Sequence, residues 1–422
     1  MPTIRSSRVV VGGEVRPATV RHESGTVVDV GWGHADVDYG DLVVMPGLVD
    51  SHVHVNEPGR TEWEGFETAT RAAVSGGTTT IVDMPLNSIP PTIDMAALSS
   101  KRSSAKKSLW CDVAFWGGLV PGNQDDVPGL IAQGVCGFKA FLVDSGVPEF
   151  PPVGTDRLKN DRGGLPTLVH AESSGHLEEF EGDPRSYAAY LRTRPIAAEV
   201  AAIEAIADLA GPIHVLHVSS GEAAELIGLT HLTGETCPHY LTFASEDIPD
   251  GATEYKCAPP IRDSSAREAL WQALIKGDLD MVVSDHSPAP AELKGLESGD
   301  FSAAWGGISS LQLRLPAVWT GAESRSVGFA QLTEWLSTAP ARLSGLDSHK
   351  GSIGPGLDAD LVVWDPEAEL LVAGASLQHR HPVTPYEGMR LKGRVVETIL
   401  AGKAVFSKGI IGHRRGRMLR RQ

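Results

Sequence analysis

Residues 47–60 read Gly-Leu-Val-Asp-Ser-His-Val-His-Val-Asn-Glu-Pro-Gly-Arg and place two histidines, His52 and His54, at the end of an apolar run. Side chains two residues apart point the same way along a β-strand, so both imidazoles would face one spot. Two neutral imidazoles at the end of a buried strand form half of a metal site. The alternative is a pair of surface histidines where a strand ends, so the remaining ligands must come from elsewhere in the chain.

Around this stretch, the middle of the chain alternates apolar strand-like runs with helical stretches, which is typical of a parallel sheet. The helical stretches, such as 64–75 and 197–209, carry apolar residues at spacings of three and four. Eight parallel strands with crossover helices close into a (β/α)8 barrel, whose active site lies at the carboxyl ends of the strands. The eight expected strands are 42–54, 78–83, 112–116, 137–141, 167–170, 213–217, 234–238 and 281–285.

Both ends of the chain have a different texture, with short apolar runs separated by glycine-containing turns. This pattern is typical of small antiparallel strands. We therefore expect an α/β protein in which residues 43–349 form a (β/α)8 TIM-type barrel. Residues 1–42 and 350–422 would pair into one small β-sandwich domain.

Composition limits the partners of the chain. Its 422 residues carry a formal net charge of −16, which disfavours nucleic acid and anionic membranes as partners. The one basic segment, 413–422, is expected to be a solvated terminus or a subunit contact. No apolar signal core and no run of about 18 apolar residues occurs. Four cysteines without a Cys-x-x-Cys pair fit reduced thiols, so we expect a cytoplasmic protein.

Four further residues that can bind metal or move a proton occur at or near the ends of the expected strands. They are Lys139, His170, His217 and Asp285. Four neutral imidazoles, a bridging lysine carbamate and one carboxylate would satisfy two divalent ions about 3.5–4 Å apart, with a shared hydroxide as nucleophile. Asp285 would then be both a ligand and the general base and acid, taking the proton of water and returning it to the leaving nitrogen.

Lys139 lies inside the apolar run Gly-Phe-Lys-Ala-Phe. Burial of an ammonium lowers its pKa and makes the neutral amine available. A neutral amine can capture carbon dioxide as a carbamate, whose two oxygens can bridge two cations. The alternative is a lysine that extends to the surface, and the histidines and aspartate expected around it favour the carbamate.

The other histidines are weaker candidates. His214 lies three residues before His217 and is expected on the opposite face of its strand, packed in the core. His239 and His286 lie near the expected mouth and are candidates for hydrogen bonds to the ligands. His22 and His379 are expected on the surface or in loops.

At this point the chain resembles the amidohydrolase superfamily over nearly its full length, in the cyclic-amidase branch and, within it, the allantoinases. The resemblance implies that the six residues above are dinuclear metal ligands and that Lys139 is N6-carboxylated. The segments that carry it are 46–54, 56–65, 83–92, 137–142, 235–241, 258–262, 284–288 and 305–312.

The same resemblance implies a hydrolase of purine catabolism that opens the hydantoin ring of allantoin to give allantoate. It implies two divalent ions per subunit, with zinc as the default and cobalt, manganese or iron as alternatives, and carbon dioxide for the lysine. It also implies a homotetramer. The residues that resemble substrate contacts are Ser287, Asn56, Asn87, Gly306 and Gly307.

Three alternatives stay open. Dihydroorotases resemble the chain but carry an arginine for the substrate carboxylate where Asn56 stands; Arg60 is nearby. Hydantoinases or dihydropyrimidinases carry a tyrosine near the carboxylated lysine, and residues 141–146 contain none. A non-enzymatic scaffold of the same fold would have lost metal ligands, and this chain has all six.

Overall fold

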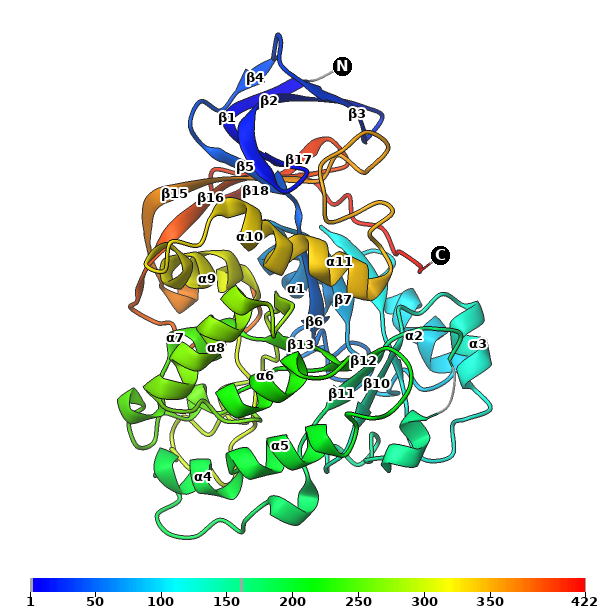
Figure 1. Cartoon of the computed structure of the whole chain (residues 1–422), viewed down its shortest axis with the longest axis vertical. Helices are drawn as coiled ribbons and strands as arrows, with labels where there is room; N and C mark the ends of the chain where they lie inside the picture. Colours follow the sequence, from blue (N-terminus) through cyan, green and yellow to red (C-terminus); the bar gives the residue numbers. More distant parts are fainter. Residues whose placement is uncertain (1–2, 160–161, 422) are drawn as a thin grey trace.

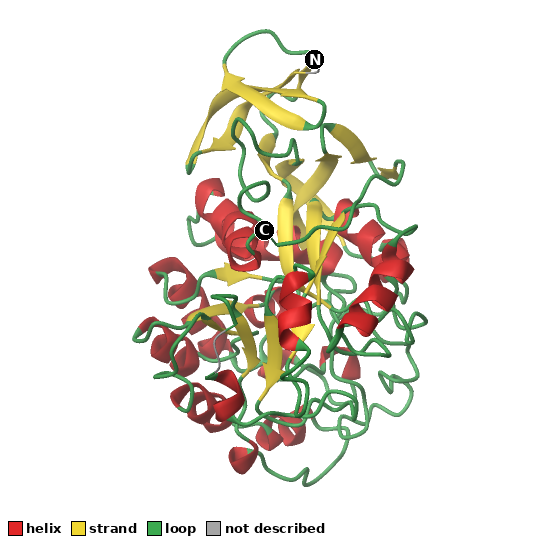
Figure 2. Ribbon diagram, turned by 90° about the vertical axis from the view of Figure 1, so that its right-hand side faces the viewer, coloured by secondary structure: helices red, strands yellow, loops and turns green. Residues whose placement is uncertain are grey.

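The computed structural model describes residues 3–159 and 162–421. A twisted β-sheet forms one end of the molecule, and a larger body of strands surrounded by helices forms the other (Figure 1). Seen from the side, the strands of the larger body lie inside a ring of helices (Figure 2). This is the expected α/β architecture with a β-sandwich and a TIM-type barrel, so the predicted fold class is confirmed.

The sheet at one end draws its strands from both ends of the chain. It has nine strands in the order β18-β17-β16-β15-β5-β1-β2-β3, and β4 pairs with β1. Their pairing joins the two chain ends as predicted, although the division into two domains at the stated boundaries stays a prediction. The strands are β1 (Thr3–Val11), β2 (Glu14–Glu23), β3 (Thr26–Gly31), β4 (Val37–Asp38), β5 (Val43–Pro46), β15 (Leu361–Leu371), β16 (Arg390–Leu400), β17 (Lys403–Ser407) and β18 (Ile410–Ile411).

The barrel consists of two arcs of parallel strands, β6-β7-β8 and β9 to β14. Trp116 joins the arcs between β8 and β9, and its backbone N–H donates to the carbonyl of Asp83 at 3.0 Å. A parallel bridge between Val53 and His286 closes the ring. The strands are β6 (Leu48–Val53), β7 (Thr78–Asp83), β8 (Asp112–Phe115), β9 (Gly117–Gly118), β10 (Phe138–Phe141), β11 (Thr167–His170), β12 (Ile213–Val215), β13 (Thr233–Thr236) and β14 (Met281–Val282).

The expected strand 42–54 is wrong as a single element, because the chain passes from one sheet to the other at Gly47. There β5 pairs with β15 in the nine-stranded sheet, whereas β6 pairs with β7 in the barrel. A Cβ on Gly47 would lie 2.3 Å from Oγ1 of Thr79, so only glycine fits this crossing. The expected strand 281–285 is also shorter, because β14 ends at Val282.

Helices cover the outside of the barrel, and the apolar face of α1 packs over β7. The expected helices 64–75 and 197–209 correspond to α1 and α5, with shorter ends. Within the described residues no helix is long and apolar enough to span a bilayer. The helices are α1 (Phe66–Ser75), α2 (Met95–Ala105), α3 (Val127–Ala132), α4 (Tyr187–Thr193), α5 (Ile196–Glu204), α6 (Gly221–Gly228), α7 (Pro238–Thr242), α8 (Ser264–Lys276), α9 (Arg314–Glu323), α10 (Phe329–Thr333) and α11 (Ala339–Ser344).

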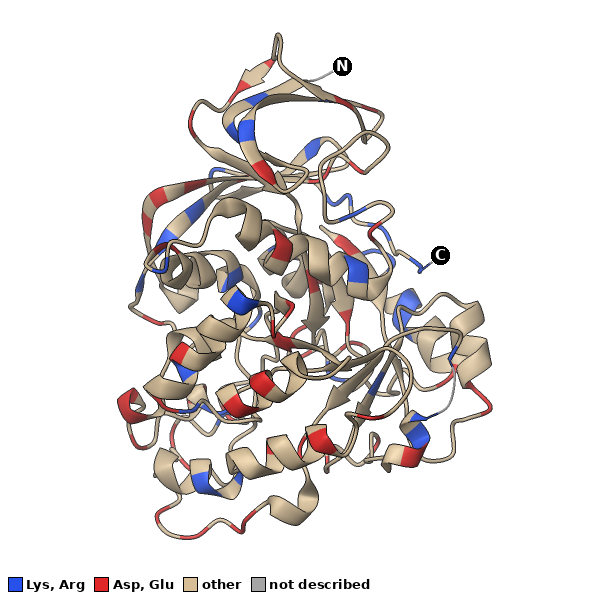
Figure 3. Cartoon of the chain, viewed as in Figure 1, with Lys and Arg blue, Asp and Glu red and all other residues tan. Residues whose placement is uncertain are grey.

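The basic C-terminal tail lies along the barrel, and none of residues 413–421 is buried, which fits the expected solvated terminus; Gln422 lies outside the described residues. Val113 donates its N–H to the carbonyl of Arg417 at 2.9 Å, and Leu419 donates to the carbonyl of Val113 at 2.8 Å. The tail therefore adds a short parallel bridge to β8, while several of its arginines stay exposed. The Lys and Arg positions along the chain are blue in Figure 3. Backbone pairing and the arginine side chains both hold this segment, since Arg417 pairs with Asp358 at 2.7 Å and Arg421 donates to the carbonyl of Cys136 at 2.9 Å.

Candidate metal centre

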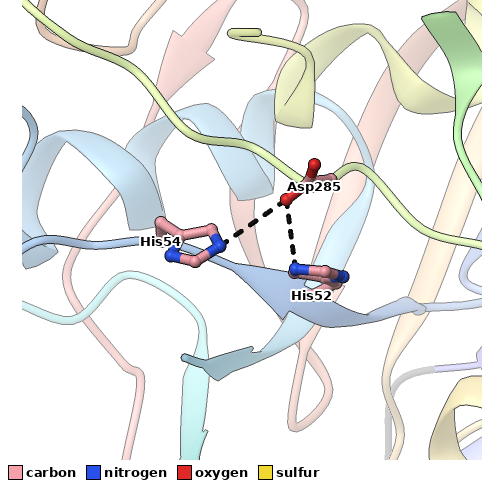
Figure 4. Close-up of side chains that lie close together, drawn as sticks. All are labelled: His52, His54 and Asp285. Carbon is pink, nitrogen blue, oxygen red and sulfur yellow. Dashed lines mark ion pairs between the residues drawn. The ribbon is translucent and has the colours of Figure 1, made fainter. Parts of the chain in front are cut away.

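Strand β6 directs His52 and His54 into the carboxyl end of the barrel, as the two-residue spacing predicted. Both are buried, and their ring centroids lie 5.4 Å apart. The carboxylate of Asp285 reaches both rings from the other side (Figure 4). Its Oδ1 lies 3.0 Å from Nε2 of His52 and 3.6 Å from Nε2 of His54. The alternative of two surface histidines is therefore wrong.

Lys139 on β10 faces the same spot. Its side chain is 1% exposed, and its Nζ lies 3.3 Å from Nε2 of His52. Burial lowers the pKa of Lys139 to about 8, which increases the fraction of neutral amine near neutral pH. The lysine does not extend to the surface.

His170 at the end of β11 and His217 beyond β12 complete the group. Their ring centroids lie 4.5 Å apart, and the ring of His217 lies 5.5 Å from that of His52. Phe141 stacks on His170 at 4.6 Å and covers that side of the group. All six predicted metal ligands thus converge in one buried region.

Four of the predicted site residues have a left-handed backbone conformation, which turns the chain sharply at each of them. Positive φ angles occur at Asn56 (65°), Asn87 (66°), His217 (40°) and Asp285 (44°). A non-glycine residue in this left-handed region is strained, and such strain is concentrated at functional sites. The turn explains why His217 faces the site although it follows the end of its strand.

Three of the four ligand imidazoles, those of His54, His170 and His217, have lowered pKa values that fit metal binding, whereas, although burial opposes it, Asp285 and Glu235 raise the pKa of His52. Burial, with Lys139 nearby, lowers the pKa of His54 to about 3, and burial beside His170 lowers that of His217 well below its usual value. Nδ1 of His217 is buried and has no hydrogen-bond partner. A buried, neutral imidazole with an unpaired nitrogen has the lone pair that a metal ligand needs, so these residues fit a divalent cation.

Two buried carboxylates, absent from the sequence prediction, orient the histidines. Glu235 on β13 lies 2.5 Å from Nδ1 of His52 and 3.1 Å from Nε2 of His214. Glu172 lies 2.7 Å from Nε2 of His170. Such contacts fix the ring orientation of a metal ligand. The signal was present in the sequence, because Glu172 stands two residues after His170.

Glu235 is ionised in this environment. Although burial opposes it, His52 and His214 lower the pKa of Glu235 to about 2. His214 is fully buried, as predicted, but it faces the carboxylate of Glu235 inside the barrel. The strand alternation alone did not predict that contact.

The remaining histidine predictions had mixed outcomes. His286 accepts a backbone hydrogen bond from Ser310 at 3.2 Å and lies 3.4 Å from Glu64, so it does not contact a ligand through its ring. His239 is fully buried near Asp285, and neither of its ring nitrogens has a partner. The expected surface or loop position is wrong for His22, which is buried in β2, whereas His379 lies in a loop as expected but is also buried.

The residues expected to contact the substrate lie on two sides of this centre. On one side, Ser287 donates its N–H to Ile308 at 3.1 Å, and a Cβ on Gly307 would lie 2.3 Å from the carbonyl oxygen of Ser287. On the other side, Nδ2 of Asn87 lies 3.3 Å from Nδ1 of His54. Asn56 is buried on the Ser287 side, where its Nδ2 donates to the carbonyl of Pro288 at 3.4 Å, and its Oδ1 has no partner among the described residues.

A cavity opens beside the two-glycine segment. It is bordered by Arg194, by Lys256 and by residues 301–306, with residues 144–146 on another side. Gly306 borders this cavity, whereas Gly307 packs on Ser287. The cavity therefore lies next to the predicted contacts and has both polar and apolar walls.

Comparisons with known proteins agree with this centre. The sequence profile of the amidohydrolase family matches residues 43–405. The allantoinase of Streptomyces avermitilis is 46% identical, covering 99% of this chain and 98% of that protein. The allantoinase of Saccharomyces cerevisiae is 42% identical, with 96% and 95% covered.

Solved structures of related enzymes have the same fold. The L-hydantoinase (dihydropyrimidinase) of Arthrobacter aurescens superimposes with a TM-score of 0.93 at 28% identity, covering 100% of both chains. The dihydropyrimidinase of Brevibacillus agri gives 0.88 at 27% identity, with 99% and 98% covered. On these matches and the converging ligand set, the chain belongs to the amidohydrolase family and, within it, to the allantoinases.

Proposed function

We propose that this protein is a metal-dependent cyclic amidohydrolase that opens the hydantoin ring of allantoin to give allantoate. The observation that carries the proposal is the convergence of six metal-ligating side chains in a chain 46% identical to an allantoinase. Water adds to the ring carbonyl, the ring C–N bond breaks, and the products are a carboxylate and an amide nitrogen that has gained a proton.

The proposed metal ligands are the six residues that meet at the carboxyl end of the barrel, with Lys139 carboxylated by carbon dioxide. Two divalent cations, with zinc as the default, would polarise the ring carbonyl and lower the pKa of water when bound. The buried carboxylates Glu235 and Glu172 hold His52 and His170 in the orientation that this requires. The six ligands are His52, His54, Lys139, His170, His217 and Asp285.

Asp285 is the proposed general base and acid. Although burial opposes it, His52 and His54 beside the carboxylate hold the pKa of Asp285 well below its usual value, so it is ionised and can accept a proton. It accepts the proton of the attacking water and returns it to the leaving ring nitrogen. Its turn conformation, with φ of 44°, fixes the carboxylate between the two rings.

The substrate contacts are assigned to both sides of the centre. Ser287 and the backbone of Gly306 and Gly307 would bind the ring amide, because amide donors and acceptors match a hydantoin. Asn87 would face its other edge, and Asn56, which donates to the carbonyl of Pro288, would lie near Ser287. Asn56 offers a neutral amide with an unpaired buried oxygen, which suits an uncharged substrate better than a carboxylate.

Hydantoinase activity is the second candidate, because the solved structures that superimpose on this chain include hydantoinases. The test is to assay the purified protein, with its metal content measured, on allantoin, hydantoin, dihydrouracil and dihydroorotate. We expect the highest kcat/KM on allantoin. A preference for hydantoin would replace the proposed substrate, and a preference for dihydroorotate would overturn the interpretation of Asn56.

The protein is further proposed to act as a homotetramer in the cytoplasm. Its four cysteines are free and buried, which fits a reducing compartment. One related allantoinase, from Aquarana catesbeiana, is described as mitochondrial. Light scattering of the purified protein tests the tetramer.

A further inference from the structure

Lys294 is a buried lysine that the proposed chemistry does not use. Its side chain is 3% exposed, and its Nζ donates three hydrogen bonds to backbone carbonyls. The acceptors are Gly307 at 2.9 Å, Trp305 at 3.1 Å and Lys256 at 3.2 Å. An ammonium has three N–H donors, so three carbonyls satisfy it completely.

A second lysine holds the same segment from the cavity side. Nζ of Lys256 donates to the carbonyl of Ala304 at 2.6 Å and to that of Ser302 at 3.5 Å. The backbone of Lys256 also accepts the N–H of Gly307 at 2.8 Å. Two lysines therefore hold the carbonyls of Ala304, Trp305 and Gly307.

The segment that contains Gly306 and Gly307 has little room to move. Gly307 has φ of 153°, and a Cβ there would lie 2.3 Å from the carbonyl oxygen of Ser287. The backbone thus packs directly on a residue two positions after Asp285. A shift of the segment would move both the glycines and their contact with Ser287.

Packing alone does not explain an ammonium at position 294. A methionine would fill a similar volume without the desolvation that a buried charge suffers. Burial indeed lowers the pKa of Lys294 to about 7. The three carbonyls are the acceptors available to this amine, and two of them, Trp305 and Gly307, belong to the segment beside the cavity.

We propose that Lys294, assisted by Lys256, is a positioning residue that fixes the Gly306–Gly307 backbone for binding of the cyclic amide. This inference rests on the proposed function, because it takes these glycines as substrate contacts. Lys294 acts through the backbone and does not touch the substrate. Its removal should therefore weaken substrate binding more than it slows the chemical step.

The test compares Lys294→Met, Lys256→Met and the wild-type holoenzyme on allantoin. We expect the KM of Lys294→Met to rise about tenfold and its metal content to stay at the wild-type level, with a smaller change in kcat. Lys256→Met loses fewer and more exposed contacts, so its KM should rise about threefold. Lys276→Met, on the surface of α8 beside Asp278, is the matched control and should change neither constant.

Hydrogen exchange of residues 302–308 provides a readout that does not need turnover. We expect faster exchange there in Lys294→Met and no change around His52 and His54. Unchanged exchange and unchanged KM in Lys294→Met would overturn the inference. If Lys294→Met does not fold, the same two measurements are made on Lys256→Met. An unchanged KM and unchanged hydrogen exchange of residues 302–308 in that variant would overturn the inference. A wild-type protein inactive on allantoin, with faster exchange in the variant, would overturn the proposed substrate alone.

Discussion

Two buried lysines at opposite ends of the barrel have opposite surroundings. Lys350 lies at the amino end, where its Nζ is 2.6 Å from Asp112, 2.6 Å from Asp360 and 2.8 Å from Asp358. Lys139 lies at the carboxyl end, where its Nζ is 3.3 Å from an imidazole nitrogen of His52. The first ammonium is surrounded by carboxylates, and the second is surrounded mainly by neutral rings.

The difference in surroundings makes Lys350 a structural cation and leaves Lys139 as an amine that could react, as the proposed carbamate requires. Although burial opposes it, Asp360 and Asp112 raise the pKa of Lys350, whereas burial lowers the pKa of Lys139 to about 8. Each end also holds three carboxylate or imidazole groups close enough to bind one metal ion. At the amino end Lys350 pairs with all three aspartates and Arg417 with two of them, so the number of potential ligands alone does not identify a metal site.

The largest effect is expected from Asp285→Asn. The amide keeps the shape of the side chain but cannot accept the proton of water, so kcat should fall by at least about 10²–10⁴-fold. Metal analysis should still find at least one bound ion, because the other five ligands are intact. Substantial residual turnover would contradict the proton role of Asp285.

Lys139→Ala should remove metal and activity together, because it removes the proposed bridging ligand. Small carboxylic acids added to the variant should restore part of both, since a carboxylate can occupy the place of the carbamate. Lys350→Met is the matched buried-lysine control and should keep its metal. Full metal content in Lys139→Ala would disprove the carbamate bridge.

Lys350→Met should instead reduce the free energy of unfolding, by about 3–5 kcal/mol, because the buried carboxylates of Asp112 and Asp360 lose their shared ammonium. Since the folded state raises the pKa of Lys350, its stabilising contribution is complete below the ordinary lysine value of 10.5 and falls as the pH rises beyond it. Denaturant titrations of both proteins at several pH values measure this. An unchanged unfolding free energy at neutral pH would show that the contacts of Lys350 with the aspartates do not stabilise the fold.

The contrast between the two lysines shows what the sequence could predict. The strand ends and their polar residues predicted the barrel and all six converging side chains, because parallel strands bring their carboxyl ends together. The role of Lys350 could not be predicted from the sequence. Asp112 is 238 positions away, and Asp360 is 10 positions away across a loop whose conformation has no periodic pattern. Pairing across the closed ring decides which lysine is neutralised.

Of the two carboxylates that contact the ligands, Glu172 stands two residues after His170 and could have been predicted, whereas Glu235 could not. Glu235 reaches His52 across 183 positions of sequence, and a buried carboxylate on a strand has no local pattern that names its partner. The division of 42–54 at Gly47 depended on Thr79 from the next strand. Local periodicity predicts which side a residue faces, whereas packing between distant segments determines where a strand is interrupted.

The smallest effect concerns the stability of the metal-free protein. Replacing Lys139 should raise the free energy of unfolding, whereas replacing Lys350 should lower it. The folded state lowers the pKa of Lys139 from 10.5 to about 8, so holding the ammonium is unfavourable. This penalty is complete below about pH 8, decreases as the pH rises, and is absent above 10.5. Metal-free Lys139→Met should therefore be more stable than the metal-free wild type at pH 7, by about 1–4 kcal/mol.

Chelator-treated samples of both proteins, unfolded in denaturant from pH 7 to pH 10, measure this difference. The advantage of Lys139→Met should shrink steadily over that range, whereas Lys350→Met stays less stable than the wild type throughout. A metal-free Lys139→Met that is less stable at pH 7 would mean that the Lys139 ammonium is stabilised by Asp285 and Glu235. The two lysines would then be alike, and the amine at the carboxyl end would not be poised to react with carbon dioxide.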